Sequence, residues 1–288
     1  LRAVILGQNG DYGLPPSQVS ATLHAGLVNH YFKGAFYPKG GGQVIADAIA
    51  HHIEEHGGSI HLRCGIERIL IENGRAVGVR TEPRKGVQHD IRAKVVLSNA
   101  DLKKTLLELV GPEHLPTDWV TRARHFQMGG AIFMGFFGVT ADMAAKGMSA
   151  TNYLQFDSYD VESFYRDMAN DGVVTPRGCY ITSTSFKDPG TPGHCPDGIT
   201  SVEVMTLVPG EASAWGVSGD AIDTARYRKS ARYLETKQAV EDNLVDRLEA
   251  LFPGTAETIV FRESASPVTH TRYTRASAGT GYGLAATP

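Results

Sequence analysis

The sequence predicts an α/β unit followed by an α+β unit built on an antiparallel sheet. In the first third of the chain, a helical pattern gives way to extended segments and then to another helix. After Gly111-Pro112, separate strand candidates are interrupted only by short helical stretches, which favours an antiparallel sheet. The 288 residues suffice for one large domain or two ordinary ones, so a two-domain chain is expected.

The composition excludes several classes of protein. Hydrophobic residues make up 42% and charged residues 20%, which does not fit disorder, collagen or a coiled coil. Lysine and arginine total 28 against 31 aspartates and glutamates, so no basic surface for nucleic acid is expected. The three cysteines form no C-x-x-C pair, which argues against a disulfide scaffold or a structural zinc site.

The first elements expected are helices separated by a glycine loop. Residues 1–31 are predicted to be mostly helical, with Ser17 as the cap of a helix that contains Leu23 and Leu27. Three consecutive glycines then disfavour regular structure and predict a loop at 37–42. A helix is expected over 43–56, ended by two further glycines.

The next segment has strand periodicity. Strands are predicted at 59–62, 66–72 and 75–82, with Asn73-Gly74 as a primed hairpin turn between the last two. A buried strand is expected at 94–98, followed by a helix at 102–110 that is capped within 99–101.

The second half predicts the antiparallel sheet and a long helix. The helix carries Val240, Leu244, Leu248 and Leu251 on one face and ends at Pro253-Gly254. A short helix is expected near 161–168. The strand candidates are 133–139, 152–156, 179–186 and 200–208.

Two local patterns suggest chemistry but favour a structural interpretation. His52 and His56 match H-x-x-E-H, yet isoleucines share their helix face and the glycines end the helix at once, so no metal is predicted. Cys195 follows His194 in a loop rich in proline and glycine, with no helix N-terminus to lower its pKa. Neither G-x-S-x-G nor the dinucleotide fingerprint G-x-G-x-x-G occurs.

A longer series of segments resembles a known family. The series is the glycine loop and its helix, the run His56-Gly57-Gly58-Ser59-Ile60, the hairpin, and Val95–Asp101. It resembles FAD-dependent oxidoreductases of the phytoene desaturase, carotenoid isomerase and retinol saturase type, within the flavin amine oxidase superfamily. Segments 266–269 and 279–283 resemble a later stretch of the same group, and 37–101 is the specific part.

The resemblance implies a partial Rossmann-like FAD-binding domain joined to a substrate domain. Residues 1–36 would be a helical part of the substrate domain, 37–105 part of the FAD domain, 106–275 the substrate domain, and 276–288 a return toward the FAD domain. The backbone of Ile66 would contact the adenine edge, and the glycine loop would lie near the flavin and the substrate. The cofactor contacts implied are Gly40, Gly41, Gly42, Ile66, Ser98, Asn99, Ala100 and Tyr282.

The sequence also departs from the family pattern. The N-terminal G-x-G-x-x-G segment and the C-terminal segment that would close over the flavin are missing, and the sequence starts at Leu1 without a methionine. These departures predict a piece of a longer protein, which by itself should bind FAD poorly because most diphosphate contacts would be absent.

The activity implied is hydride transfer between flavin and a C–C bond of an apolar polyene or retinoid. The alternatives are a flavin amine oxidase, or a non-catalytic binding or interaction protein that retains the fold. No catalytic residue is assigned, although His270, Arg272 and Tyr273 lie on a predicted extended segment near the return to the flavin. The partner expected is an apolar small molecule, not nucleic acid. A cytoplasmic location is expected, with peripheral membrane association and oligomeric state left open.

Overall fold

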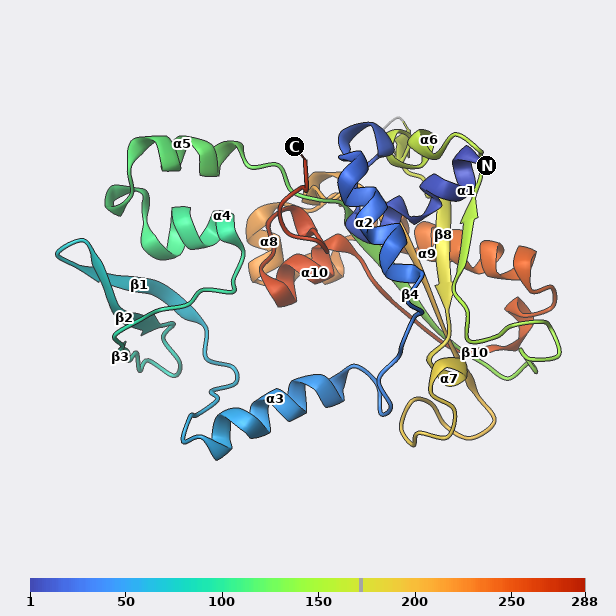
Figure 1. Cartoon of the computed structure of the whole chain (residues 1–288), viewed down its shortest axis with the longest axis horizontal. Helices are drawn as coiled ribbons and strands as arrows, with labels where there is room; N and C mark the ends of the chain where they lie inside the picture. The colour runs from blue at the N-terminus through green and yellow to red at the C-terminus, as the bar shows by residue number, and fades with distance from the viewer. Residues whose placement is uncertain (171–172, 288) are drawn as a thin grey trace.

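A computed structural model describes residues 1–170 and 173–287 and gives a mixed fold of helices and antiparallel sheets (Figure 1). The predicted class, with helices beside an antiparallel sheet, is confirmed. Residues 171–172, in the predicted substrate domain, and Pro288, the last residue of the predicted return segment, lie outside the described residues. The domain limits themselves stay predictions.

The larger sheet has five strands in the order β10-β4-β9-β8-β5, and each neighbouring pair is antiparallel. Its register runs without a break from Ala131↔Val208 to Val139↔Thr200 along β4 and β9. The predicted strand at 179–186 ends earlier, because the chain turns into a short helix. The strands are β4 (Ala131–Val139), β5 (Tyr153–Phe156), β8 (Gly178–Thr182), β9 (Thr200–Val208) and β10 (Ile259–Ala265).

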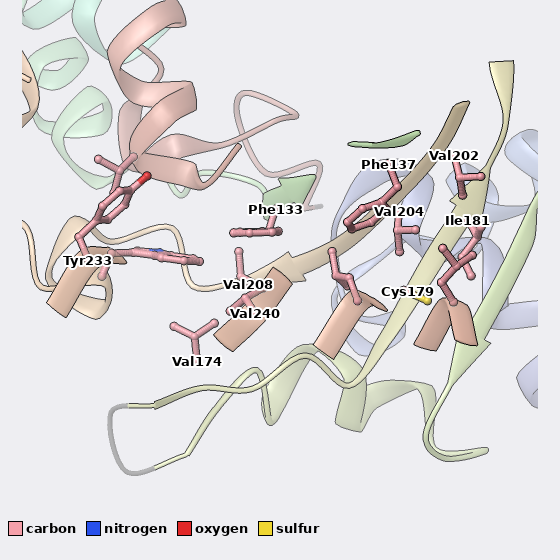
Figure 2. Packing of buried hydrophobic residues seen from close by; sticks show 14 of the residues in the cluster. Phe133, Phe137, Val174, Cys179, Ile181, Val202, Val204, Val208, Tyr233 and Val240 are labelled. Atoms are coloured by element: carbon pink, nitrogen blue, oxygen red, sulfur yellow. The ribbon is translucent and has the colours of Figure 1, made fainter. Parts of the chain in front are cut away.

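The main core lies between this sheet and α9 (Ala231–Leu251), the predicted long helix. Ser230 caps α9 by accepting a hydrogen bond from the Tyr233 amide, and apolar residues spaced at helical intervals face the sheet. Phe133 from β4 is completely buried and stacks on Trp215, with ring centroids 5.8 Å apart. Figure 2 shows Phe133 and the valines of β9, Val202, Val204 and Val208, in this core.

The smaller sheet has three antiparallel strands, β1 (Ile66–Glu72), β2 (Arg75–Thr81) and β3 (Asp90–Arg92). Asn73 and Gly74 have φ of 49° and 71°, the conformation of the predicted primed turn. Asp101 caps α4 (Leu102–Lys104), which continues as a π-helical segment, η3 (Thr105–Val110). The predicted hairpin and the predicted helix at 102–110 are therefore present.

The other described elements are short strands and helices. The predicted cap Ser17 is wrong: Ser20 caps α2, and its hydroxyl accepts from the amides of Thr22 and Leu23. These elements include η1 (Gly7–Tyr12), α1 (Arg2–Leu6), α2 (Ala21–Tyr31), α3 (Gln43–Glu55), α5 (Thr117–His125), α6 (Val161–Arg166), β6 (Ala169–Asn170), β7 (Val173–Val174), α7 (Thr184–Lys187), α8 (Gly219–Asp223) and α10 (Pro267–Thr274).

Two predicted strands, 59–62 and 94–98, do not form among the described residues. Both have the apolar content of strands buried in a sheet, but neither has a neighbouring strand here with which to pair its backbone. Val95 and Leu97 are therefore 80% and 92% exposed instead of buried. The two segments do contain the apolar residues of buried strands, but the described chain has no strand with which they pair.

Helix α3 also lacks a packing partner for its apolar face. It begins and ends as predicted, and the amides of Gly57 and Gly58 bond back to Glu54 and Ile53. Its isoleucines at 45, 49 and 53 are all exposed, and Figure 1 shows the helix standing apart from both sheets. The accessible surface is 17305 Å², whereas a compact monomer of this mass has about 12,000 Å². Apolar faces in residues 43–100 thus lack a packing partner.

Candidate functional site

A cleft of about 1000 Å³ lies between the small sheet, the segment leading to α4, and α10. Four predicted contacts with the cofactor line it: Ile66 at the start of β1, and Ser98, Asn99 and Ala100 just before the cap of α4. These positions are more than thirty residues apart in sequence, yet they face one cavity. Because β1 is an edge strand of its sheet, one row of its backbone groups is unpaired within the described chain.

The walls of the cleft are fastened by hydrogen bonds between distant segments. The Asp101 carboxylate accepts from the Lys104 amide at 3.0 Å and from the Ser277 amide at 2.8 Å. Arg275, at the end of α10, forms an ion pair with Glu82, which follows β2. The Arg275 guanidinium lowers the pKa of the Glu82 carboxyl by hydrogen bonding to its charged form. The C-terminal stretch is therefore attached to both the hairpin and α4.

Helix α10 corrects one expectation. Residues 267–274 form a helix that starts with a capping box between Ser266 and Thr269, so the predicted extended segment is wrong. The Pro267 ring fits the first helical position, where no amide donor is needed. Arg272 and Tyr273 line the cleft. Burial lowers the pKa of His270, and within the described chain its Nε2 and the Nε of Arg272 are buried without a hydrogen-bond partner.

The predicted glycine loop lies elsewhere, against the loop that follows α7. Gly40 and Gly41 have φ of 91° and 80°, which other residues rarely adopt. The Gly40 amide donates to Asp188 Oδ2 at 2.6 Å, and His194 Nε2 lies 2.9 Å from the same oxygen. A Cβ on Gly41 would lie 3.1 Å from the His194 ring, so the ring packs directly on the loop. Gly42 is exposed, at the start of α3.

These contacts predict that Asp188 holds the glycine loop in place. Hydrogen bonds from His194 and then the Gly40 amide lower the pKa of Asp188 to about 2. Asp188→Ala should therefore speed amide hydrogen exchange at residues 40–42 about tenfold at neutral pH. The measurement is exchange followed by mass spectrometry, and Asp197→Ala, an exposed aspartate of the same loop, is the matched control.

The acid dependence of this exchange follows from the lowered pKa. A carboxyl with a depressed pKa stabilises the folded state above its unfolded pKa of about 4, and this contribution is lost as the pH falls toward 2. Protection of the loop in the wild type should then fall over that range. Equal exchange in wild type and Asp188→Ala would rule out this role for Asp188.

An apolar cavity of about 300 Å³ lies against the face of the five-stranded sheet that points away from α9. Tyr282, predicted to lie beside the flavin, lines this cavity and not the larger cleft. Its hydroxyl donates to the Gly10 carbonyl, and a Cβ on Gly13 would come within 2.5 Å of its ring. Burial, with a smaller effect of the Asp11 charge, raises the pKa of Tyr282 to about 12.

The predicted contacts therefore fall in three places. The cleft collects four of them, the glycine loop packs on Asp188 and His194, and Tyr282 lies at the apolar cavity. Sequence reasoning did not identify Asp11 or Asp188, and it treated His194 only as a neighbour of Cys195. No motif could have revealed Asp188, because its partner Gly40 is 148 residues away in the chain.

Two sequence patterns had suggested chemistry, the His52–His56 pair and Cys195. The ring centroids of His52, in α3, and His56, just after it, lie 4.2 Å apart, and both residues are exposed. Within residues 1–170 and 173–287, no three His, Cys, Asp or Glu side chains gather as metal ligands would. The Cys195 thiol donates to the Ile199 carbonyl at 2.7 Å, inside its own loop. Among the described helices, none has the length and apolar character needed to cross a membrane.

Comparison with known proteins shows extended similarity to one group of enzymes. The chain is 27% identical over 293 residues to an all-trans-retinol 13,14-reductase from Danio rerio, and the match includes 98% of the chain. It is 25% identical over 256 residues to a chloroplastic prolycopene isomerase from Daucus carota, across 88% of the chain. The chain is similar to all-trans-retinol 13,14-reductases and to prolycopene isomerases. The resemblance of residues 37–101 is thereby confirmed, and this relationship extends through the rest of the chain.

The chain spans less than half the length of these relatives: 46% of the retinol reductase and 37% of the isomerase. A second Danio rerio relative, 26% identical over 89% of the chain, is named an inactive all-trans-retinol 13,14-reductase. An oxidoreductase from Methanosarcina mazei covers 80% of this chain and 43% of its own with 18% identity and a TM-score of 0.48. No family model matches the chain.

Proposed function

We propose that this chain forms part of an FAD-dependent oxidoreductase that transfers hydride between flavin and a C–C bond of an apolar polyene or retinoid. The observation that carries the proposal is the cleft, because four residues assigned to the cofactor by resemblance line one cavity. The relationship to retinol reductases over 98% of the chain supports the same activity. FAD would supply the hydride acceptor or donor.

The residues of the cleft fit part of FAD. The cavity of about 1000 Å³ is open along the edge strand β1, which offers backbone groups to an adenine ring at Ile66. Arg272 contributes a buried Nε without a partner in the described chain, a donor that a bound cofactor could satisfy. The sequence holds no G-x-G-x-x-G loop for the diphosphate. We therefore assign only the adenosine side of the cofactor to this chain.

The unpartnered faces around the cleft support an incomplete cofactor domain. The isoleucines of α3 are exposed with Val95 and Leu97, although their patterns are those of a helix and a strand packed in a sheet. A polypeptide that also contains the diphosphate-binding strand and helix would cover them. The 288-residue chain alone should then bind FAD weakly, and tight stoichiometric FAD on it would contradict this proposal.

The lining of the apolar cavity supports an apolar substrate. Side chains of the sheet face opposite α9 line this cavity, together with the aromatic rings of Phe156 in β5 and Phe164 in α6. Such an apolar surface favours apolar ligands. A non-catalytic protein is the second candidate, since one relative is named inactive.

Flavin absorption tests these alternatives on a polypeptide that includes this chain and the diphosphate-binding segment. We expect visible absorption from bound FAD and an anaerobic redox change with a polyene or retinoid. The change is bleaching of oxidised flavin, or its reappearance from reduced flavin, because hydride leaves one partner for the other. A response only to amines favours the amine oxidase. Bound FAD that no substrate changes favours the non-catalytic candidate, and a colourless folded protein contradicts FAD binding.

A further inference from the structure

Two arginines converge on Tyr273, on the wall of the large cleft that α10 forms. Arg228 Nη2, in η6 (Arg226–Lys229), donates a hydrogen bond to the Tyr273 hydroxyl at 2.9 Å. The guanidinium carbon of Arg272 lies 5.8 Å from the centre of the Tyr273 ring. The hydrogen bond from Arg228, with a smaller effect of Arg272, lowers the pKa of the Tyr273 phenol. Two positive charges therefore flank one phenol, which a ligand can reach because Tyr273 is 69% exposed.

Neither Arg228 nor Arg272 has a carboxylate partner within residues 1–170 and 173–287. The arginines of this part of the chain that do form ion pairs are Arg80, Arg92, Arg166, Arg247, Arg262 and Arg275. Residues 224–234, around Arg228, contain three arginines and one lysine but no acidic residue. Like charges that lack a counter-charge repel one another, so a bound anion would stabilise this arrangement.

Arg272 also has hydrogen-bonding capacity that the described chain does not use. Its Nη1 donates to the Ile222 carbonyl at 3.3 Å, a long hydrogen bond, whereas its Nε is buried without a partner among the described residues. A buried donor without an acceptor costs free energy, and native proteins rarely leave one unpaired. Because Arg272 lines the cleft, a ligand oxygen there would supply the missing acceptor.

We propose that Arg228, Tyr273 and Arg272 form a binding site for a phosphate monoester in this cleft. A phosphate monoester carries nearly two negative charges and three oxygens that accept hydrogen bonds. The site offers two positive charges, two guanidinium groups and a hydroxyl, so both the charges and the donors match. A carboxylate has one charge and two oxygens, and it would leave part of this site unused.

The proposed phosphate belongs to a second ligand and not to FAD. Only the adenosine side of FAD is assigned to this chain, and the FAD diphosphate is expected on a segment that carries the G-x-G-x-x-G loop. The adenine is expected at Ile66, on the small sheet, whereas Arg272 and Tyr273 lie on the wall formed by α10. The inference therefore goes beyond the proposed function and does not require it.

Titration calorimetry of the 288-residue chain with inorganic phosphate, at low ionic strength, tests this site. We expect saturable binding of one phosphate, with acetate at least about tenfold weaker. Arg228→Met and Arg272→Met should each weaken phosphate binding about tenfold. Arg272→Lys should weaken it as well, because lysine keeps the charge but not the planar guanidinium. Arg226→Met, at an exposed arginine of the same short helix, is the matched control and should bind phosphate like the wild type.

Equal affinity of the wild type for phosphate and acetate would overturn the proposal, without relying on any variant. Phosphate binding that Arg226→Met weakens as much as Arg272→Met would also overturn it, since such binding is a general attraction to basic residues. A polypeptide that also contains the diphosphate-binding segment separates the inference from the proposed function. FAD should bind to it without displacing phosphate, and displacement would overturn the assignment to a second ligand. Failure to bind FAD, with phosphate binding intact, would contradict only the proposed function.

Discussion

Phe133→Ala should lower the free energy of unfolding by about 3–5 kcal/mol. Phe133 is completely buried between β4 and α9, and its ring stacks nearly parallel to that of Trp215, at 9° between the planes. Removing the ring loses its transfer free energy and leaves a cavity that the sheet and the helix cannot fill without shifting. A loss of this size is a large share of the stability of an ordinary domain. Urea denaturation of the 288-residue chain measures it.

Phe36→Ala is the matched control, since Phe36 is 91% exposed. The same deletion at an exposed position should change the unfolding free energy by less than about 0.5 kcal/mol. If the two substitutions were equally costly, the core would not lie between the sheet and α9. A cost below about 1 kcal/mol for Phe133→Ala would contradict the close packing around Trp215 in the same way.

Local periodicity predicted the elements whose partners lie within the chain. The hairpin around Asn73-Gly74, helix α3 and strand β9 have the predicted limits to within a residue. The segment at 94–98 was predicted from apolar content alone, and content does not supply a pairing partner. Its failure to form a strand, like the exposure of the isoleucines of α3, reflects missing neighbours and not a wrong pattern.

The site was predictable only where the family resemblance supplied positions. Ile66 and Ser98 line one cleft, but their own sequence surroundings are those of ordinary strand and loop residues. Asp188, which bonds the Gly40 amide, and Tyr180, which lines the apolar cavity, have no motif around them. Such residues gain their roles from tertiary contacts across more than a hundred positions, which periodicity does not encode.

Asp157→Ala should cost about 3 kcal/mol at neutral pH, because it leaves a buried guanidinium without its charge partner. The Arg247 side chain, on α9, is 10% exposed and forms two parallel bonds to Asp157, at 2.7 and 3.1 Å. The Pro176 carbonyl and Asn243 accept further bonds from Arg247, so the guanidinium is fixed in place. Asp157 itself is 44% exposed, and its removal therefore matters chiefly through Arg247.

The effect of Asp157→Ala should shrink in acid. Hydrogen bonds from Arg247 lower the pKa of the Asp157 carboxyl, so its contribution is complete above the unfolded pKa of about 4 and is lost as the pH falls through the folded pKa. Denaturation of wild type and variant at several pH values measures the narrowing gap. Asp167→Ala, in an ion pair with the 62% exposed Arg166, should cost only about 0–1 kcal/mol. A gap between wild type and Asp157→Ala that stays constant from pH 7 into acid would show that the charge of Asp157 contributes nothing, and that the cost of its removal is one of packing.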